Sequence, residues 1–117
     1  MSHSLKITEA WEMHSITHWW VTCYHIFTKA GYFRGGKIYS QDKIFRVLSG
    51  EIEFISSPDK GLGVNDTYEI LTPESWEKII PAWVPHIFRA VTDCVFIESF
   101  SENAENEKYE RYKKIKK

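Results

Sequence analysis

Cationic and aromatic residues recur through the middle of this 117-residue chain, in a combination that suits a phosphorylated sugar or a nucleotide. An arginine can hold a phosphate through two parallel hydrogen bonds, and a lysine adds a compact positive charge. Aromatic side chains offer flat faces on which a sugar ring or a base can pack. The candidate ligand-binding residues are Arg34, Tyr39, Lys43, Arg46 and Trp83.

The same residues also have an ordinary structural interpretation. In it, Arg34 and Lys43 are solvated charges, Trp83 fills a turn between two prolines, and Phe45 and Phe88 belong to the core. Packing is the first role of aromatic residues that alternate along a strand, so we favour the core for Phe45 and Phe88. Lys43 shares a strand face with Phe45, and a lysine buried there requires a partner.

The five histidines give no obvious metal site. His14 and His18 have the i, i+4 spacing of ligands on a helix, but the aromatic and β-branched residues around them argue against a helix. His25 lies in an apolar strand and is interpreted as a hydrogen-bonded core residue. His86 differs because it opens a strand directly after a proline-rich turn.

Charge and motifs exclude several function classes. The formal charge of -1 offers no overall basic field for nucleic acid or an anionic membrane. The Gly35-Gly36 pair lacks the GxGxxG spacing of a dinucleotide site, and no GK[ST], GxSxG, CxxC or HExxH motif occurs. We therefore expect no nucleotide cofactor, no nucleic-acid partner and no membrane association.

The elements that must position these residues are predicted to be strands. Residues 19–28 form a strand covered on both faces, and residues 43–55 form two strands joined as a hairpin at Ser49-Gly50. Residues 86–90 and 94–100 form another strand pair, while residues 57–66 form an exposed loop. The pattern predicts an all-β domain over residues 1–117, with a core of about 19–100 and a charged C-terminal helix or tail at 101–117.

Two stretches carry a resemblance to the cupin superfamily, and within it to the dTDP-4-dehydrorhamnose 3,5-epimerase group. That group has "RGLHYQ", then "KLVRVLxGEV", and later "IPxGxAHGF". This chain has RGGKIY at 34–39, KIFRVLSGEI at 43–52 and IPAWVPHIF at 80–88, in the same order and with similar spacing. The resemblance implies a single-domain cupin jelly-roll β-barrel whose open end binds a sugar nucleotide or related carbohydrate, and a homodimer.

The chemistry of those relatives does not carry over residue by residue. The histidine of RGLHYQ, which removes a proton beside the keto group, corresponds to Lys37, and the tyrosine proton donor falls near Glu98 or Ser99. The cupin metal ligands fall on Gly36, Ile38 and Lys43, so only His86 of four remains. We therefore expect no metal, unless His25 and an acid such as Glu98 converge on His86.

The leading interpretation is a metal-independent cupin that binds a sugar nucleotide or sugar phosphate, with isomerisation or epimerisation in carbohydrate biosynthesis as its candidate activity. Lys37 or His86 would act as the base and Glu98 as the acid or the orienting carboxylate. The alternatives are a non-catalytic carbohydrate-binding or regulatory cupin and a metal-dependent enzyme that uses His86. Cys23 and Cys94 in apolar runs, with no signal segment, favour a reducing, cytoplasmic location.

Overall fold

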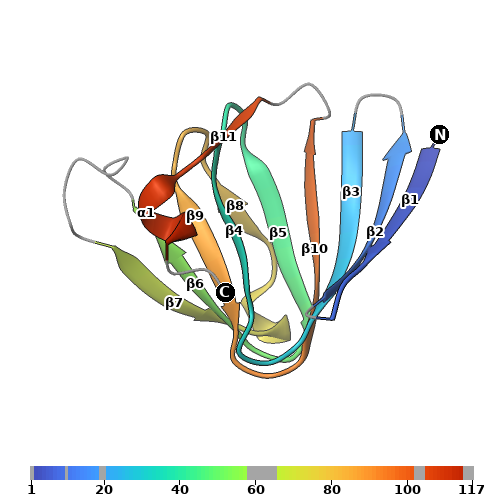
Figure 1. Cartoon of the computed structure of the whole chain (residues 1–117), viewed down its shortest axis with the longest axis horizontal. Coiled ribbons are helices and arrows are strands. Elements are labelled where there is room, and N and C mark those ends of the chain that lie inside the picture. Colours follow the sequence, from blue (N-terminus) through green and yellow to red (C-terminus); the bar gives the residue numbers. More distant parts are fainter. Residues whose placement is uncertain (1, 10, 19–20, 58–65, 102–104, 115–117) are drawn as a thin grey trace.

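The computed structural model describes residues 2–9, 11–18, 21–57, 66–101 and 105–114, which form two antiparallel sheets facing each other (Figure 1). The first sheet has the order β1-β2-β3-β10-β5-β8, and the second has the order β11-β4-β9-β6-β7. The elements are β1 (Ser2–Ile7), β2 (Trp11–His18), β3 (Val21–Thr28), β4 (Phe33–Tyr39), β5 (Lys43–Ser49), β6 (Ile52–Ser56), β7 (Thr67–Leu71), the 3-10 turn η1 (Pro73–Ser75), β8 (Lys78–Ile80), β9 (His86–Ala90), β10 (Cys94–Ser101), β11 (Asn106–Lys108) and α1 (Glu110–Lys113).

The core lies between the two sheets and is built by alternate residues of each strand. Phe45 and Val47 of β5, Phe88 of β9 and Phe96 of β10 are all buried there. The rings of Phe45 and Phe88 stack with their centroids 4.4 Å apart, so the core role expected of both is confirmed. The sheets meet at the end that carries the β3–β4, β5–β6 and β9–β10 connections and spread apart at the other end (Figure 1).

Two connections expected to be hairpins are arches between the sheets. The strands β5 and β6 form as predicted, but β5 pairs with β10 and β8, whereas β6 pairs with β7 and β9. Likewise β9 and β10 lie in different sheets. The two arches bond to each other instead: the Val91 amide donates to the Glu51 carbonyl at 3.0 Å, and the Glu51 amide donates to Thr92 Oγ1 at 3.1 Å.

The strand β3 buries one of its two faces and leaves the other largely exposed. Thr22, Ile26 and Thr28 point into the structure and are buried, while Cys23 and His25 are exposed on the outer face. The prediction that this strand is covered on both faces is therefore wrong. The prediction that Cys23 and His25 belong to the core is wrong for the same reason. Aromatic and apolar residues fill both alternating sets of this strand, so the pattern did not distinguish the inner face.

The two ends of the chain add structure beyond the expected core of 19–100. The strands β1 and β2 extend the first sheet, and β11 adds an edge strand beside β4 in the second. Of the helix or tail expected at 101–117, the described residues form β11 and the single helical turn α1, whose Tyr112 is buried against Ile55 and Ile87. None of the helices in the described part of the chain is long and apolar enough to cross a membrane.

Candidate ligand-binding site

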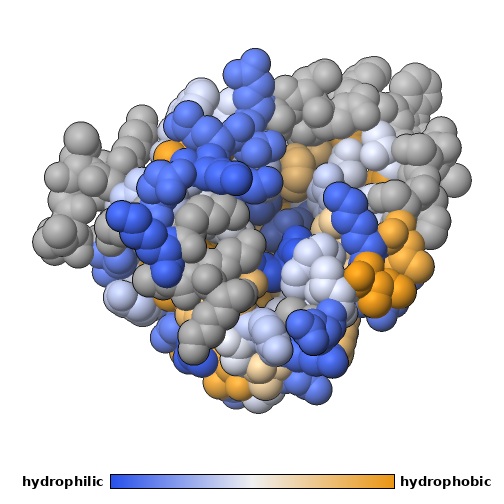
Figure 2. Space-filling view, viewed as in Figure 1, coloured by the Kyte–Doolittle hydropathy of each residue, from blue (hydrophilic) through white to orange (hydrophobic). Residues whose placement is uncertain are grey.

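A polar hollow opens between the sheets at their separated end (Figure 2). It consists of two adjoining cavities of about 330 and 360 Å³, a size within the range of small-molecule sites. Around both cavities, cationic side chains come from β1, β4, β5 and β11, and Glu98 of β10 is the one carboxylate among the described lining residues. The residues shared by the two cavities are Lys6, Met13, Arg34, Lys37, Tyr39 and Glu98.

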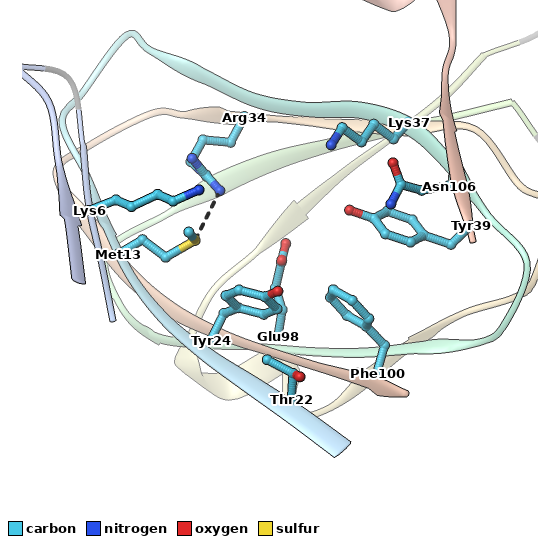
Figure 3. Close-up of a pocket in the computed structure, with 10 residues that line it drawn as sticks. All are labelled: Lys6, Met13, Thr22, Tyr24, Arg34, Lys37, Tyr39, Glu98, Phe100 and Asn106. Atoms are coloured by element: carbon cyan, nitrogen blue, oxygen red, sulfur yellow. Dashed lines mark hydrogen bonds between the residues drawn. The ribbon is translucent and has the colours of Figure 1, made fainter. Parts of the chain in front are cut away.

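A bulge in β4 brings two cations to the same side of that strand. Strict alternation would send Arg34 and Lys37, three positions apart, to opposite faces. Between them Gly35 and Gly36 have φ of 97° and 83°, and the β4–β9 pairing shifts register between Gly35 and Lys37. Glycine adopts such positive φ values without steric strain. As a result, Arg34, Lys37 and Tyr39 all line the hollow (Figure 3).

A buried cluster of three ionisable groups forms the floor of the hollow. Lys43, His86 and Glu98 are only 2%, 1% and 7% exposed. Lys43 Nζ lies 3.2 Å from His86 Nε2 and 3.4 Å from Glu98 Oε1, and it lies 4.4 Å from the centre of the Tyr39 ring. Burial lowers the pKa of Lys43, and the nearby charge of Glu98 offsets only part of this effect. The partner that Lys43 required is therefore Glu98, together with His86.

The environment of His86 keeps its ring neutral. Nδ1 lies 3.0 Å from the Val84 carbonyl and donates to it, which leaves Nε2 as an acceptor facing the Lys43 ammonium. Burial and the Lys43 charge lower the pKa of His86 from 6.5 to about 3. So low a pKa makes His86 a poor base at neutral pH, and its contact with Lys43 is its main interaction at the site.

This low pKa predicts sensitivity to acid. The unfolded chain takes up a proton on His86 near pH 6.5, whereas the folded chain takes it up only near pH 3. Between these two pH values the unfolded state binds more protons than the folded state. The free energy of unfolding should therefore decrease as the pH is lowered, by up to about 1.4 kcal/mol per pH unit. Urea unfolding followed at several pH values measures this slope. The slope should be smaller in His86→Gln, and an unchanged slope would contradict the assignment.

Arg34 is a guanidinium without an ion-pair partner among the described residues; the charge of Glu98 acts on it only from beyond ion-pair distance, where it raises the pKa that burial lowers. Among the residues that the structure describes, no carboxylate lies within ion-pair distance of it, and Nη2 reaches only Met13 Sδ at 3.6 Å (Figure 3). Its carbon Cζ lies 4.3 Å from the centre of the Trp11 ring. Burial lowers the pKa of Arg34, although the group still stays charged at neutral pH. This is a positive charge removed from water and directed into the hollow.

Two phenol groups complete the polar lining. Burial, followed by the nearby charge of Glu98, raises the pKa of Tyr24 and of Tyr39 above the ordinary value of 10.0. Both hydroxyls therefore keep their protons at neutral pH and can donate hydrogen bonds. The rings of Tyr24 and Tyr39 also lie 5.2 and 5.1 Å from that of Phe100, so the three rings form an aromatic wall of the hollow.

The structure brings most of the predicted site residues together. Arg34, Lys37, Tyr39, Lys43 and Glu98 line the hollow, and His86 contacts Lys43 beneath it. Arg46 and Trp83 are not brought there. The Arg46 guanidinium lies 4.8 Å from the Trp76 ring on the outer side of β5, because position 46 alternates with the inward residues of that strand. Trp83 is 46% exposed and borders a separate, smaller pocket.

Other lining residues were missed by the sequence analysis. Lys6 of β1 and Met13 of β2 belong to strands that the sequence analysis did not predict, and Phe100 ends the predicted strand at 94–100. Tyr24 shares the period-two face of the buried Thr22 and Ile26, and that shared face was the available signal. Lys6 lies in the six-residue strand β1, whose sequence includes several polar residues and gave no comparable signal.

The residues present do not fit the metal centre that a cupin fold implies. Of the four ligand positions, only His86 offers a donor, and its Nε2 faces the Lys43 ammonium. The described residues contain no group of three histidine, cysteine, aspartate or glutamate side chains placed to hold a metal. His25 cannot join His86, because it lies on the outer face of the sheet with its ring 6.4 Å from that of His14.

No protein-family model and no curated protein matches this sequence, but solved structures match its fold. CapF with the inhibitor 3-isopropenyl-tropolone has a TM-score of 0.74 at 13% identity over 89% of this chain. The capsular polysaccharide assembling protein CapF from Staphylococcus aureus has a TM-score of 0.71 at 14% identity over 85%. The W96F oxalate decarboxylase from B. subtilis has a TM-score of 0.73 at 13% identity over 91%.

These matches establish the fold. CapF and oxalate decarboxylase are both cupin-fold proteins, so this chain has the cupin jelly-roll fold, as its sequence predicted. At 12–14% identity they establish the fold alone, and they do not confirm the closer resemblance to the epimerase group. The chain spans 34%, 28% and 30% of the three matched chains, about a third of each.

Proposed function

We propose that the hollow between the sheets binds an anionic carbohydrate, either a sugar phosphate or a sugar nucleotide, without a metal ion. Arg34 carries this proposal, because its guanidinium is partly desolvated, has no carboxylate partner among the described residues and points into the hollow. A phosphate would supply the missing negative charge and accept two parallel hydrogen bonds. Lys6 and Lys37 line the same cavity and add positive charge around that position.

The other end of the hollow suits a sugar. Tyr24 and Tyr39 combine flat faces with donating hydroxyls, and Phe100 adds an apolar face. The structurally similar CapF is a capsular polysaccharide assembling protein, which is consistent with a carbohydrate ligand here. Isomerisation or epimerisation of a bound keto sugar would require proton transfer by groups such as Lys37 and Glu98, and exchange of solvent deuterium into the sugar would reveal it.

Metal independence is supported by the donor atoms at the floor of the hollow. A metal ion there would have to displace the Lys43 ammonium, which already occupies the free nitrogen of His86 and contacts Glu98. Elemental analysis of the purified chain, with and without a chelator, tests this point directly. One firmly bound metal ion per chain would overturn the metal-free proposal.

The binding proposal predicts a large effect at Arg34 and little effect at Arg46. A thermal-shift panel of dTDP, UDP and GDP, their sugar conjugates and simple sugar phosphates identifies a ligand, because a ligand that binds only the folded state raises its stability. Loss of a charge-assisted contact in Arg34→Met should then weaken binding by about 1.5–3 kcal/mol, roughly tenfold to a hundredfold by calorimetry. Arg46→Met is the matched control, since Arg46 lies on the outer side of β5.

Two results would contradict the proposal. If no phosphate-bearing compound stabilised the protein, an anionic ligand would be ruled out. An equal loss of affinity in Arg34→Met and Arg46→Met would show that general charge, rather than the hollow, governs binding.

We also propose that the outer face of the first sheet packs against a second copy of the chain. Leu5, Ile16, Val21, Ile44 and Ile79 are each between 43% and 61% exposed, and all lie on this face. An apolar face with few charges is complementary to itself across a two-fold axis. Sedimentation velocity should give the mass of a dimer at micromolar concentration, and Ile16→Lys should shift it to the monomer. A monomeric wild type would contradict the interface.

A further inference from the structure

Lys43 is the one lysine among the described residues whose amino group is buried at the floor of the hollow. Its Nζ has two acceptors, His86 Nε2 at 3.2 Å and Glu98 Oε1 at 3.4 Å, and the Tyr39 ring covers a third side at 4.4 Å. Lys43 and Glu98 both line the cavity that also contains Arg34 and Lys37. A ligand held by those cations is therefore held beside a lysine and a carboxylate.

This arrangement contains the parts needed for an amine nucleophile. A lysine reacts through its neutral form, and removal from water lowers the proton affinity of its amine. Glu98 is close enough to take the proton and to return it. His86 stays neutral and its Nδ1 is fixed on the Val84 carbonyl, so it orients the amino group without competing as a cation.

Building on the anionic-ligand site proposed above, we propose that Lys43 forms a reversible imine with the carbonyl carbon of a phosphorylated aldehyde or keto sugar bound in the hollow. Glu98 takes a proton from the ammonium, and the freed electron pair of Nζ forms the C–N bond as the C=O π bond breaks. Glu98 gives this proton to the carbonyl oxygen, which becomes a hydroxyl, and then takes a second proton from the nitrogen. That hydroxyl then leaves as water with a proton from Glu98. The products are a protonated imine and one water molecule, with Glu98 again a carboxylate.

The surrounding charges define the substrate class. Arg34, Lys37 and Lys6 favour a phosphate, and the aromatic wall of Tyr24 and Phe100 favours a sugar carbon chain. Glu98 is the single lining carboxylate among the described residues, so an anionic ligand meets little repulsion. A phosphorylated open-chain sugar satisfies both requirements, whereas a neutral aldehyde satisfies only one.

Reductive trapping tests the proposal on the full chain. We would incubate the protein with D-glyceraldehyde 3-phosphate and cyanoborohydride near neutral pH and map modified lysines by mass spectrometry. Lys43 should be labelled at least about tenfold faster than the exposed Lys29, because exposed lysines remain protonated at this pH. Glycerol 3-phosphate, which lacks the carbonyl group, should compete with labelling of Lys43 and leave labelling of Lys29 unchanged.

Two variants separate the covalent step from binding. Lys43→Arg keeps a positive charge and cannot form an imine, so it should lose the fast labelling, with Lys29→Arg as the matched control. Arg34→Met should slow labelling of Lys43 in proportion to the affinity that it loses for glycerol 3-phosphate. Melting temperatures confirm that each variant is folded, and competition in the wild type tests the proposal even where a variant does not fold.

The outcomes distinguish this inference from the proposed function. If Lys43 is labelled fast and glycerol 3-phosphate blocks this labelling, both the imine at Lys43 and the anionic-ligand site are supported. Stabilisation by glycerol 3-phosphate with labelling confined to exposed lysines overturns the imine and leaves the anionic site intact. If Lys43 is not labelled and no phosphate-bearing compound, glycerol 3-phosphate included, stabilises the protein, both proposals fall.

Discussion

Replacing Lys43 by methionine should lower the free energy of unfolding by about 3 kcal/mol, because it leaves a buried carboxylate without its cation. Glu98 is 7% exposed, and Lys43 is its ion-pair partner at 3.4 Å. Methionine has a similar length and fills most of the same space, so the loss should arise from charge rather than from a cavity. Urea unfolding of the variant and the wild type under the same conditions measures the difference.

An exposed ion pair in the same chain provides the control. Lys78 and Glu69 are closer together, at 2.8 Å, but their side chains are 30% and 47% exposed. Such pairs contribute roughly 0–1 kcal/mol, so Lys78→Met should change stability by less than about 1 kcal/mol. Equal losses in the two variants would show that the burial of Lys43 has no special energetic consequence.

The double variant Lys43→Met/Glu98→Leu shows what the pair contributes to folding. Removing both charges removes the desolvation penalty, so we expect this variant to regain most of the stability lost in Lys43→Met. The direction of the Lys43 pKa agrees with this expectation, because burial lowers it more than Glu98 raises it. A pair that folding does not need, at the floor of a hollow, fits a chemical role better than a structural one.

Local sequence patterns predicted the central strands and part of the lining of the hollow. Alternation identified the inward face of β5, and with it both the core residue Phe45 and the unusual position of Lys43. The resemblance correctly predicted the cupin fold and placed Arg34, Lys37, Tyr39 and Glu98 in one hollow. The glycine pair at 35–36 is the one local signal for the bulge that places Lys37 beside Arg34, because glycine inside a strand often marks a bulge.

Pairing between strands was not predictable in the same way. A short turn such as Ser49-Gly50 looks alike in a hairpin and in an arch between sheets, and only contacts with distant segments separate the two. The outward position of Arg46 followed from alternation, yet its residue type suggested a ligand contact. The strand β11 depends on pairing with β4 across a long sequence separation, which composition cannot reveal.

The arch at Gly50 predicts the second large effect. Gly50 has a φ of 82°, and a Cβ added there would overlap the Asp93 carbonyl oxygen and lie 2.9 Å from Cys94 Cα. Gly50→Ala therefore combines the strain of a positive φ with a clash against the neighbouring arch, and we expect it to reduce the free energy of unfolding by about 3 kcal/mol or more. Urea unfolding monitored by tryptophan fluorescence measures the loss.

A second glycine separates these two causes. Gly31 has a similar φ of 86°, but a Cβ added there would meet nothing within 4 Å. Gly31→Ala should therefore show only the backbone strain, roughly 1–2 kcal/mol. The difference between the two variants isolates the contact between the β5–β6 and β9–β10 arches, which holds the two sheets together at the closed end. Equal losses at both positions would mean that the close approach of the two arches at Gly50 adds nothing to the cost of the substitution.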